Sequence, residues 1–168
     1  KLAAPTGKSV GIVGGGPAGL TAAYQLLRRG HSVKVYDQMP EMGGMLRYGI
    51  PEYRLPKAVL KAETDAIAAL GAEFVNNFKV GRDAELSELR NRHDALIVAN
   101  GAWRSSSMRV EGEGLAGVWG GIDFLRAVAL GEMPAIGRRV AVVGGGNTAM
   151  DACRTAVRLG AEAVYVVY

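Results

Sequence analysis

The sequence predicts an α/β fold in which two units with parallel strands follow each other along the chain. An apolar strand, a glycine-rich turn, a helix and a second apolar strand succeed one another over residues 9–37, which is the order of a βαβ unit with a right-handed crossover. The same order returns over residues 138–168. The repeat therefore indicates two related nucleotide-binding units rather than one large sheet.

The N-terminal part of the chain alternates between predicted strands and helices. Residues 9–13 form a buried strand, residues 17–29 a helix, and residues 32–37 a second strand. Residues 42–57 contain two adjacent glycines and two prolines five positions apart, so we predict a loop without regular structure. The remaining expected elements are a helix over 58–70, short strands at 73–75 and 78–80, a helix at about 84–92 and a buried strand at 95–100.

The C-terminal part begins with a long connection and then restarts the pattern. Residues 103–121 are polar and glycine-rich, so we expect a weakly structured connection between two lobes, followed by a helix over 122–130. The domains predicted from this are 1–113 and 114–168, the second being a linker and the incomplete start of another domain.

Composition excludes several classes of protein. The net charge is +4, but basic residues are scattered among acids, so we expect no nucleic acid as a partner. Cys153 is the single cysteine, which excludes a disulfide framework and cysteine-rich metal sites; we expect no bound metal and a reducing, cytoplasmic setting. No apolar run approaches the length of a membrane span. The opening residues KLAAPTGKS suggest an excised or processed piece of a longer protein.

The first glycine turn has the pattern of a dinucleotide site. Gly14 allows the tight turn, Gly16 lets the backbone approach a pyrophosphate, and Gly19 packs the helix against the strand. Asp37, at the end of the second strand, is placed to accept hydrogen bonds from a ribose. The alternative for the three glycines is a cluster that serves helix packing alone. The alternative for Asp37 is a solvated acid at a strand end.

The second turn differs from the first at the position that selects the nucleotide. Its pattern is Gly144, Gly146 and Ala149, and Tyr168 falls where Asp37 stands in the first unit. A carboxylate there would repel a 2′-phosphate, so its loss favours NADPH over NADH. Asp151 is expected to be a charge favoured by the start of its helix, and Cys153 a core residue.

Three segments carry a family resemblance: GGMLRYGIPEYRLPK at 43–57, ANGAW at 99–103 and GGGNTAMDACRTAVRLGA at 144–161. With them the sequence resembles the FAD- and NADPH-binding oxidoreductases typified by the small (beta) subunit of glutamate synthase, and a module of dihydropyrimidine dehydrogenase is similar. The resemblance implies a Rossmann-like FAD-binding domain, a parallel sheet with helices, followed by the first βαβ unit of a second Rossmann-like, NADPH-binding domain.

The resemblance also implies which residues contact each cofactor. The FAD contacts would be Gly14, Gly15, Gly16, Pro17, Ala18, Gly19, Asp37, Gly43, Gly44, Met45, Arg54, Val80 and Gly101. The NADPH contacts would be Gly145, Gly146, Asn147 and Thr148. Paired glycines let the backbone lie against an extended cofactor, and Arg54, flanked by Pro51 and Pro56, can offer its guanidinium to phosphate or flavin oxygens. A purely structural Arg54 is the alternative. Asn100 and Asp37 depart from the Thr and Glu that are commoner in the family.

The function implied is hydride transfer from NADPH to the flavin, after which electrons pass to iron–sulfur clusters of another domain or of a large catalytic subunit. The cofactor supplies the chemistry, so we assign no catalytic acid, base or nucleophile. In the family, a cysteine-rich iron–sulfur segment would precede Lys1 and the arginines that hold the 2′-phosphate would follow Tyr168. Two alternatives stay open: a flavin enzyme of the disulfide reductase type, which the missing CxxC pair disfavours, and a non-catalytic nucleotide-binding fragment.

Overall fold

The computed structural model describes residues 2–168, which form two compact units. The first unit runs from the N-terminal end to Arg47 and from Leu55 to Gly101, and the second contains Tyr48–Arg54 and Ala102–Tyr168. The chain therefore leaves the first unit after Arg47 and returns to it at Leu55. The functional domains predicted at 1–113 and 114–168 divide the chain differently and stay a prediction.

The first unit is built on a parallel sheet of order β3-β2-β1-β4. This is the order of the first half of a doubly wound dinucleotide-binding fold. The strands are β1 (Ser9–Val13), β2 (Ser32–Tyr36), β3 (Ala72–Val75) and β4 (Ala95–Val98). The helices are α1 (Pro17–Arg28), α2 (Met45–Tyr48), α3 (Lys57–Ala69) and α4 (Leu86–Arg92). The α/β prediction is confirmed, and so are the strands expected at 9–13, 32–37, 73–75 and 95–100.

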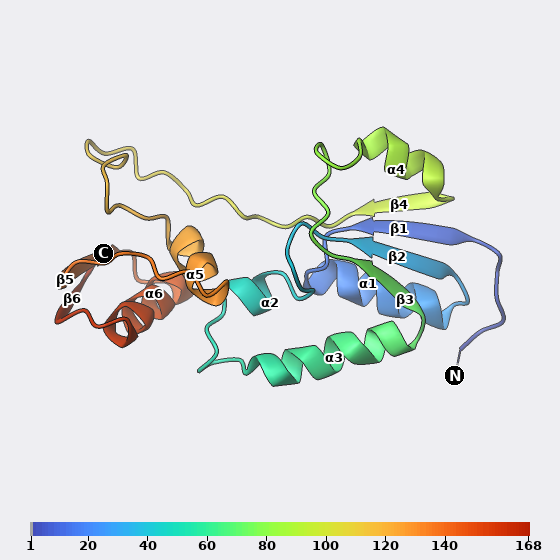
Figure 1. The fold of residues 1–168 in the computed structure, drawn as a ribbon, viewed down its shortest axis with the longest axis horizontal. Coiled ribbons are helices and arrows are strands. Elements are labelled where there is room, and N and C mark those ends of the chain that lie inside the picture. The colour runs from blue at the N-terminus through green and yellow to red at the C-terminus, as the bar shows by residue number, and fades with distance from the viewer. Residues whose placement is uncertain (1) are drawn as a thin grey trace. The chain divides into compact units, whose positions relative to one another are not determined.

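Helices cover both faces of this sheet, with α1 and α3 on one face and α4 on the other (Figure 1). Val33 and Val35 face α1, whereas their neighbour Tyr36 faces the cluster that contains Leu89 of α4. Successive strand residues point to opposite faces, so an apolar run with few polar interruptions is what a sheet covered on both sides requires.

Two local predictions in the first unit are wrong. Residues 42–57 were expected to lack regular structure, yet Met45–Tyr48 form the short helix α2 and Lys57 already begins α3. Arg47 stabilises this turn, because its Nε donates to the carbonyl of Met42 (2.7 Å). The strand expected at 78–80 is reduced to an isolated bridge between Val80 and Ala84.

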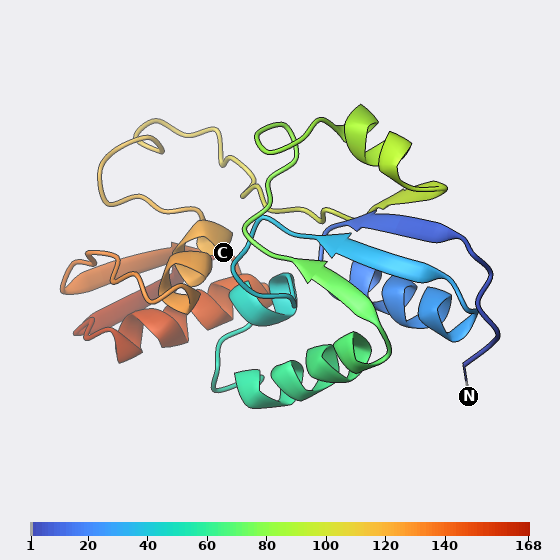
Figure 2. The same ribbon diagram turned by 45° about the vertical axis from the view of Figure 1, so that its right-hand side comes forward.

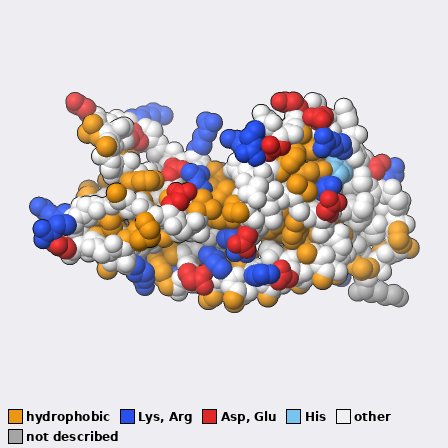
Figure 3. Space-filling model, viewed as in Figure 1, with side chains coloured by type: hydrophobic (Ala, Val, Ile, Leu, Met, Phe, Trp, Pro, Cys, Tyr) orange, Lys and Arg blue, Asp and Glu red, His pale blue; other side chains and the backbone are white. Residues whose placement is uncertain are grey.

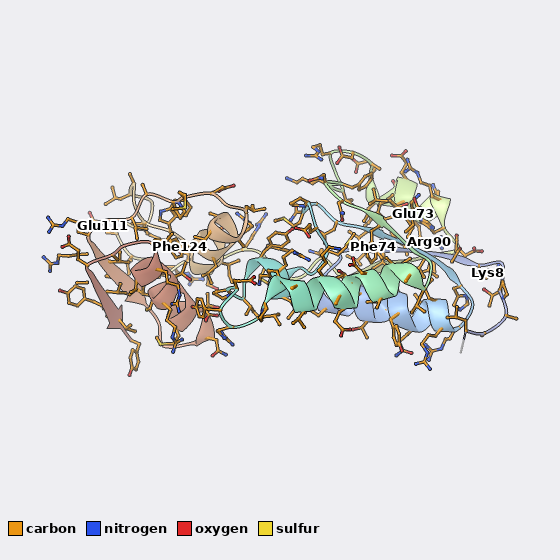
Figure 4. All side chains as sticks on the ribbon, turned by 60° about the horizontal axis from the view of Figure 1, so that its bottom comes forward. Lys8, Glu73, Phe74, Arg90, Glu111 and Phe124 are labelled. Atoms are coloured by element: carbon orange, nitrogen blue, oxygen red, sulfur yellow. The ribbon has the colours of Figure 1, made fainter. Side chains whose placement is uncertain are left out.

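The second unit repeats the strand, turn, helix, strand order around a two-stranded parallel sheet. Its elements are α5 (Gly121–Ala129), β5 (Arg139–Val143), α6 (Asn147–Arg158) and β6 (Ala163–Val167). Phe124 and Leu125 of α5 and Ala152 and Ala156 of α6 form its buried core, against which Val140, Val142 and Val164 pack. Figure 2 shows the ribbon of this unit, and Figure 4 labels Phe124 on α5. The predicted connection over 103–121 contains no helix or strand before α5.

Basic and acidic side chains are interspersed on the face of the molecule that Figure 3 shows. Many are paired, as in Lys61–Asp65 and Arg92–Glu88, which are neighbours one helical turn apart. Within residues 2–168 no helix is both long and apolar enough to cross a membrane.

Candidate dinucleotide sites

The first glycine turn is held between the carboxyl ends of three strands. The amide of Gly14 donates to the carbonyl of Tyr36 at 2.8 Å, and that of Ala99 donates to the carbonyl of Val13 at 2.7 Å. Gly14 has φ +108°, and a Cβ there would overlap the carbonyl of Ala99. A Cβ on Gly19 would overlap the carbonyl of Gly14. These two glycines are therefore required by the fold itself.

Gly16 has a different role, because open space surrounds the position of its missing side chain. The nearest atom to an added Cβ is Cα of Gly44, at 3.7 Å, and Gly16 has the extended conformation (φ −81°, ψ −173°) that any residue adopts. The fold alone would accept a side chain at Gly16. What the glycine preserves is open space at the N-terminus of α1, where free amides and the helix dipole favour a phosphate.

The glycine pair at 43 and 44 lies directly against this turn. The amide of Gly43 donates to the carbonyl of Gly15 at 2.8 Å, and a Cβ on Gly44 would lie 2.6 Å from Cα of Gly16. Both glycines have positive φ, +131° and +53°. The structure thus brings together the two glycine motifs that the sequence linked only by resemblance, and α2, which begins at Met45, follows immediately.

Asp37 is buried, with 7% of its surface exposed, and both of its carboxylate oxygens are bonded to backbone amides. Oδ2 accepts from Gly15 at 2.6 Å and Oδ1 accepts from Met39 at 2.8 Å. The alternative of a solvated acid at a strand end is therefore wrong, since this carboxylate fixes the glycine turn. A carboxylate oxygen has two lone pairs, so Asp37 can accept a further bond from a ribose hydroxyl.

Val80, Gly101 and Asn100 lie on segments that converge at the same edge of the sheet. The amide of Phe78 donates to the carbonyl of Asp37 at 2.9 Å, which places the segment before Val80 beside the end of β2. Gly101 lies two positions after Ala99, whose carbonyl is next to Gly14, and has φ +71°. The side-chain amide of Asn100 donates through Nδ2 to the backbone carbonyl of Gly101 at 3.3 Å.

The second turn reproduces the first almost residue by residue. The amide of Gly144 donates to the carbonyl of Val167 at 2.8 Å, as Gly14 does to Tyr36, and Gly144 has φ +119°. No atom lies within 4 Å of an added Cβ on Gly146, which precedes Asn147 and Thr148 at the start of α6. The start of α6 is therefore also open at the position of its glycine.

Tyr168 occupies the place that Asp37 has in the first unit, as the sequence alignment predicts. It follows β6 directly, and its ring lies against Gly145, whose added Cβ would be 3.3 Å from Cγ of Tyr168. In the first unit the equivalent Gly15 is bonded to a carboxylate, whereas an aromatic ring stands here. The second site has no acid of its own at the position that would bind a ribose.

Arg54 makes a contact that the sequence did not indicate. Its Nη1 donates to Oδ2 of Asp151, on α6, at 2.6 Å. Both residues belong to the second unit, because the segment Tyr48–Arg54 packs there. Asp151, expected to be a charge near a helix start, is instead a buried partner of Arg54. The predicted FAD contact of Arg54 stays a prediction.

Sequence reasoning also missed Arg47. Its side chain is buried, and besides its bond to Met42 it pairs with Glu41 through Nη1 at 3.1 Å. Arg47 therefore braces the loop that presents Gly43 and Gly44. Its only signal in the sequence is an acid and a base six positions apart on either side of a glycine pair.

No cluster of three or more histidine, cysteine or acidic side chains that could hold a metal ion occurs in the part of the chain that the structure describes. Cys153, on α6, is partly buried, and burial raises the pKa of its thiol. The open space at Gly16 and at Gly146, each at the start of a helix, is accordingly the feature that indicates a bound ligand.

Comparison with known proteins agrees with this geometry. The family model of the pyridine nucleotide-disulphide oxidoreductases matches residues 8–168. The chain belongs to this family. Among solved structures, FprA from Mycobacterium tuberculosis, determined in complex with NADPH, is similar to this chain with a TM-score of 0.76 and 28% identity, over 88% of this chain and 36% of FprA.

Curated members of the family are more similar in sequence. The beta subunit of the NADP(+)-dependent formate dehydrogenase of Moorella thermoacetica is 47% identical, over 99% of this chain and 24% of its own length. The small chain of the NADPH glutamate synthase of Azospirillum brasilense is 42% identical, over 96% of this chain and 36% of its own length. The chain thus spans about a quarter to a third of these relatives.

Proposed function

We propose that this chain is part of a flavoprotein oxidoreductase that takes a hydride from NADPH onto FAD and passes electrons to iron–sulfur clusters of another domain or subunit. The observation that supports it best is the open space at Gly16 and Gly146, each at the N-terminus of a helix in a βαβ unit. An enzyme that transfers electrons between two nucleotide cofactors needs two such dinucleotide turns.

The residues of the first unit fit FAD. The amides at the start of α1 would face its pyrophosphate, Asp37 its adenosine ribose, and the backbone of Gly43 and Gly44 the extended part of the molecule. Gly14, Gly15, Pro17, Ala18, Gly19, Met45, Val80 and Gly101 complete the proposed set in this unit. Arg54, which belongs to the second unit, is proposed from the family resemblance alone. Bound FAD would supply the redox chemistry, accepting a hydride and releasing electrons singly. The protein binds and orients it.

The second unit fits a nicotinamide nucleotide held at Gly145, Gly146, Asn147 and Thr148. The start of α6 offers unpaired amides to a pyrophosphate, and the site lacks an acid that would repel a 2′-phosphate. The curated relatives are named for NADP(+) or NADPH, which supports the same choice here.

The names of the relatives also support the proposed partners. They are a subunit beta and a small chain, that is, components of larger assemblies. We therefore propose an iron–sulfur domain or a large catalytic subunit, as in glutamate synthase, as the acceptor of electrons, and the cytoplasm as the place of action.

A flavin enzyme of the disulfide reductase type is supported less well, because Cys153 is alone in the sequence and a redox disulfide needs two cysteines. A nucleotide-binding fragment without turnover is the other candidate. A dithiol substrate assay tests the first alternative and flavin reduction by NADPH tests the second.

The deciding experiment is to purify the chain, release its cofactor and separate it by chromatography. We expect FAD, with the absorption spectrum of an oxidised flavin, and its bleaching by NADPH in the longer parent protein. A chain that carries or takes up only a nicotinamide nucleotide, at the Gly14–Gly19 turn, would contradict the proposal.

A further inference from the structure

His93 follows α4 directly and lies on the face of the first sheet that α4 covers (Figure 1). A Cβ on Gly11 of β1 would lie only 2.5 Å from Cδ2 of His93, so the imidazole occupies the place that a side chain at Gly11 would take. Nε2 of His93 lies 3.0 Å from the hydroxyl of Tyr36, and the two rings meet edge to face. A glycine in a strand thus gives the imidazole room beside Tyr36.

Tyr36 connects this contact to the first glycine turn. It is the buried last residue of β2, and its backbone carbonyl accepts from the amide of Gly14 at 2.8 Å. Asp37 follows it and accepts from the amide of Gly15 at 2.6 Å. The side chain of Tyr36 belongs to the cluster under α4, whereas its backbone holds the start of the turn. A displacement of Tyr36 therefore moves both acceptors to which the amides of the turn are bonded.

Tyr36 also packs on the segment that leads to Val80. The ring centroids of Tyr36 and Phe78 are 5.0 Å apart, and the amide of Phe78 donates to the carbonyl of Asp37 at 2.9 Å. Val80 packs against the same buried cluster as the ring of Tyr36. Tyr36 thus contacts two parts of the proposed FAD site, the glycine turn and the segment of Val80, and His93 is bonded to its hydroxyl.

The surroundings of His93 favour a neutral ring. Burial lowers the pKa of His93, and Lys34 on β2 and Arg92 on α4 lower it further. Glu73 on β3 and Asp94 raise it, but by less. Within residues 2–168, Nδ1 of His93 is buried without a hydrogen-bond partner. Both nitrogens of an imidazolium are donors, so a protonated ring would bury an unpaired charged N–H group here.

We propose that His93 is a positioning residue for the first dinucleotide turn and acts on it through Tyr36. The neutral ring holds the side chain of Tyr36, and the backbone of Tyr36 and Asp37 then fixes the amides that would face FAD. This inference rests on the proposed function for its ligand, but the support that His93 gives the turn does not depend on any ligand. FAD affinity thereby depends on the protonation of a residue outside the proposed set of FAD contacts.

The first test concerns the turn and uses the ligand-free chain. His93→Leu leaves the buried Tyr36 hydroxyl without its partner, so hydrogen exchange at the amides of Gly14 and Gly15 should become about tenfold faster. Tyr36→Phe keeps the ring and removes only the hydroxyl, so its acceleration should be smaller. Exchange measured by NMR should change less in α3, on the other face of the sheet. Unchanged exchange at the turn in the folded variants, or an equal acceleration throughout the first unit, would overturn the proposed support whether or not the chain binds FAD.

The second test concerns the route through Tyr36 and uses titration with FAD. His93→Leu should weaken FAD binding about tenfold and Tyr36→Phe about threefold. The double variant buries no hydroxyl without a partner, so its FAD affinity should recover toward that of Tyr36→Phe alone. Losses that add in the double variant would show that His93 acts by another route, and this result overturns the proposal.

The third test concerns protonation and uses His93→Gln. A glutamine amide can bond to the Tyr36 hydroxyl but does not titrate, so at about pH 7.5 this variant should bind FAD within about twofold of wild type. Because binding favours the neutral ring, lowering the pH to about 5.5 should weaken FAD binding by wild type more than binding by His93→Gln. An equal pH dependence of FAD affinity in the two proteins would overturn the role of His93.

His31 provides a matched control, because it is the other histidine of the chain and precedes β2 at the end opposite Tyr36. Its Nδ1 lies 2.8 Å from the hydroxyl of Thr6 in an exposed contact. His31→Gln should change neither exchange at the glycine turn nor FAD binding, and a response equal to that of His93→Leu would contradict the proposal. Failure of every protein, wild type included, to bind FAD while exchange responds as expected would overturn the effect on FAD and count against the proposed function, but leave the support of the turn established.

Discussion

Asp37 illustrates how one side chain can serve the turn and a ligand together. Its two oxygens accept from the amides of Gly15 and Met39. Replacing Asp37→Asn puts an NH₂ group where one amide donor now points, so we expect a loss of about 1–3 kcal/mol in the free energy of unfolding and a similar loss in FAD binding. Urea denaturation and titration with FAD measure the two quantities. Asp65→Asn, which breaks a surface pair with Lys61, is the control and should change neither.

Gly14 and Gly16 should separate stability from binding. The methyl group of an alanine at Gly16 would have no neighbour closer than 3.7 Å, so Gly16→Ala should keep the wild-type stability. The variant should lose FAD affinity by at least about tenfold, because this methyl group would enter the space proposed for the phosphates. An alanine at Gly14 would overlap Ala99 at φ +108°, so Gly14→Ala should lower the free energy of unfolding by about 1–3 kcal/mol. Gly16→Val should abolish binding. Wild-type flavin content in a folded Gly16→Val variant would contradict the assignment of this space to FAD.

At the scale of elements, α4 is tied to the sheet by the residue that follows it. Leu89 is fully buried, and Nε2 of His93 lies 3.0 Å from the hydroxyl of Tyr36 on β2. A Cβ on Gly11 of β1 would lie 2.5 Å from the His93 ring, so the glycine makes room for it. The short helix is therefore anchored by one leucine and one neutral imidazole.

This anchor predicts a pH dependence of stability. Burial lowers the pKa of His93 from its ordinary value of 6.5, and Lys34 and Arg92 lower it further. The unfolded chain then binds more protons than the folded one in the window below 6.5, so the free energy of unfolding should fall as the pH falls through that window. Thermal unfolding between pH 7.5 and 5 measures this. His93→Gln should reduce the change of unfolding free energy with pH in this range. An unchanged pH dependence in the variant would mean that other groups cause it.

For the whole molecule, two glycine turns share the same backbone bond to the second strand of their unit but differ at the residue that we propose selects the nucleotide. Asp37 stands at the first turn, and Tyr168 lies against Gly145 at the second. A carboxylate that would bind a ribose and repel a 2′-phosphate is thus present in the first unit and replaced by an aromatic ring in the second.

We therefore expect that NADH does not reduce bound FAD faster than NADPH, because no carboxylate stands at Tyr168 to favour an unphosphorylated ribose. Stopped-flow reduction of bound FAD by each nucleotide measures the two rates. A clear preference for NADH would contradict this account.

The two βαβ units could be predicted from the sequence because their signals are local. Apolar strands, glycine turns and helices follow one another within thirty residues. The equal spacing in the two units aligns Tyr168 of the second with Asp37 of the first. The same local reasoning failed at α2, because its turn depends on a bond from Arg47 to Met42 that composition does not reveal.

Only the tertiary structure decided which distant groups meet. Arg54 and Asp151 are 97 positions apart, and nothing in either neighbourhood indicates that they pair. Gly43 and Gly44 contact Gly15 and Gly16 although a whole helix and strand separate the two pairs in the sequence. The buried state of Asp37 follows from that packing. Sequence patterns specify backbone periodicity and turn chemistry, whereas the partner of a buried charge such as Asp151 depends on which elements pack against it.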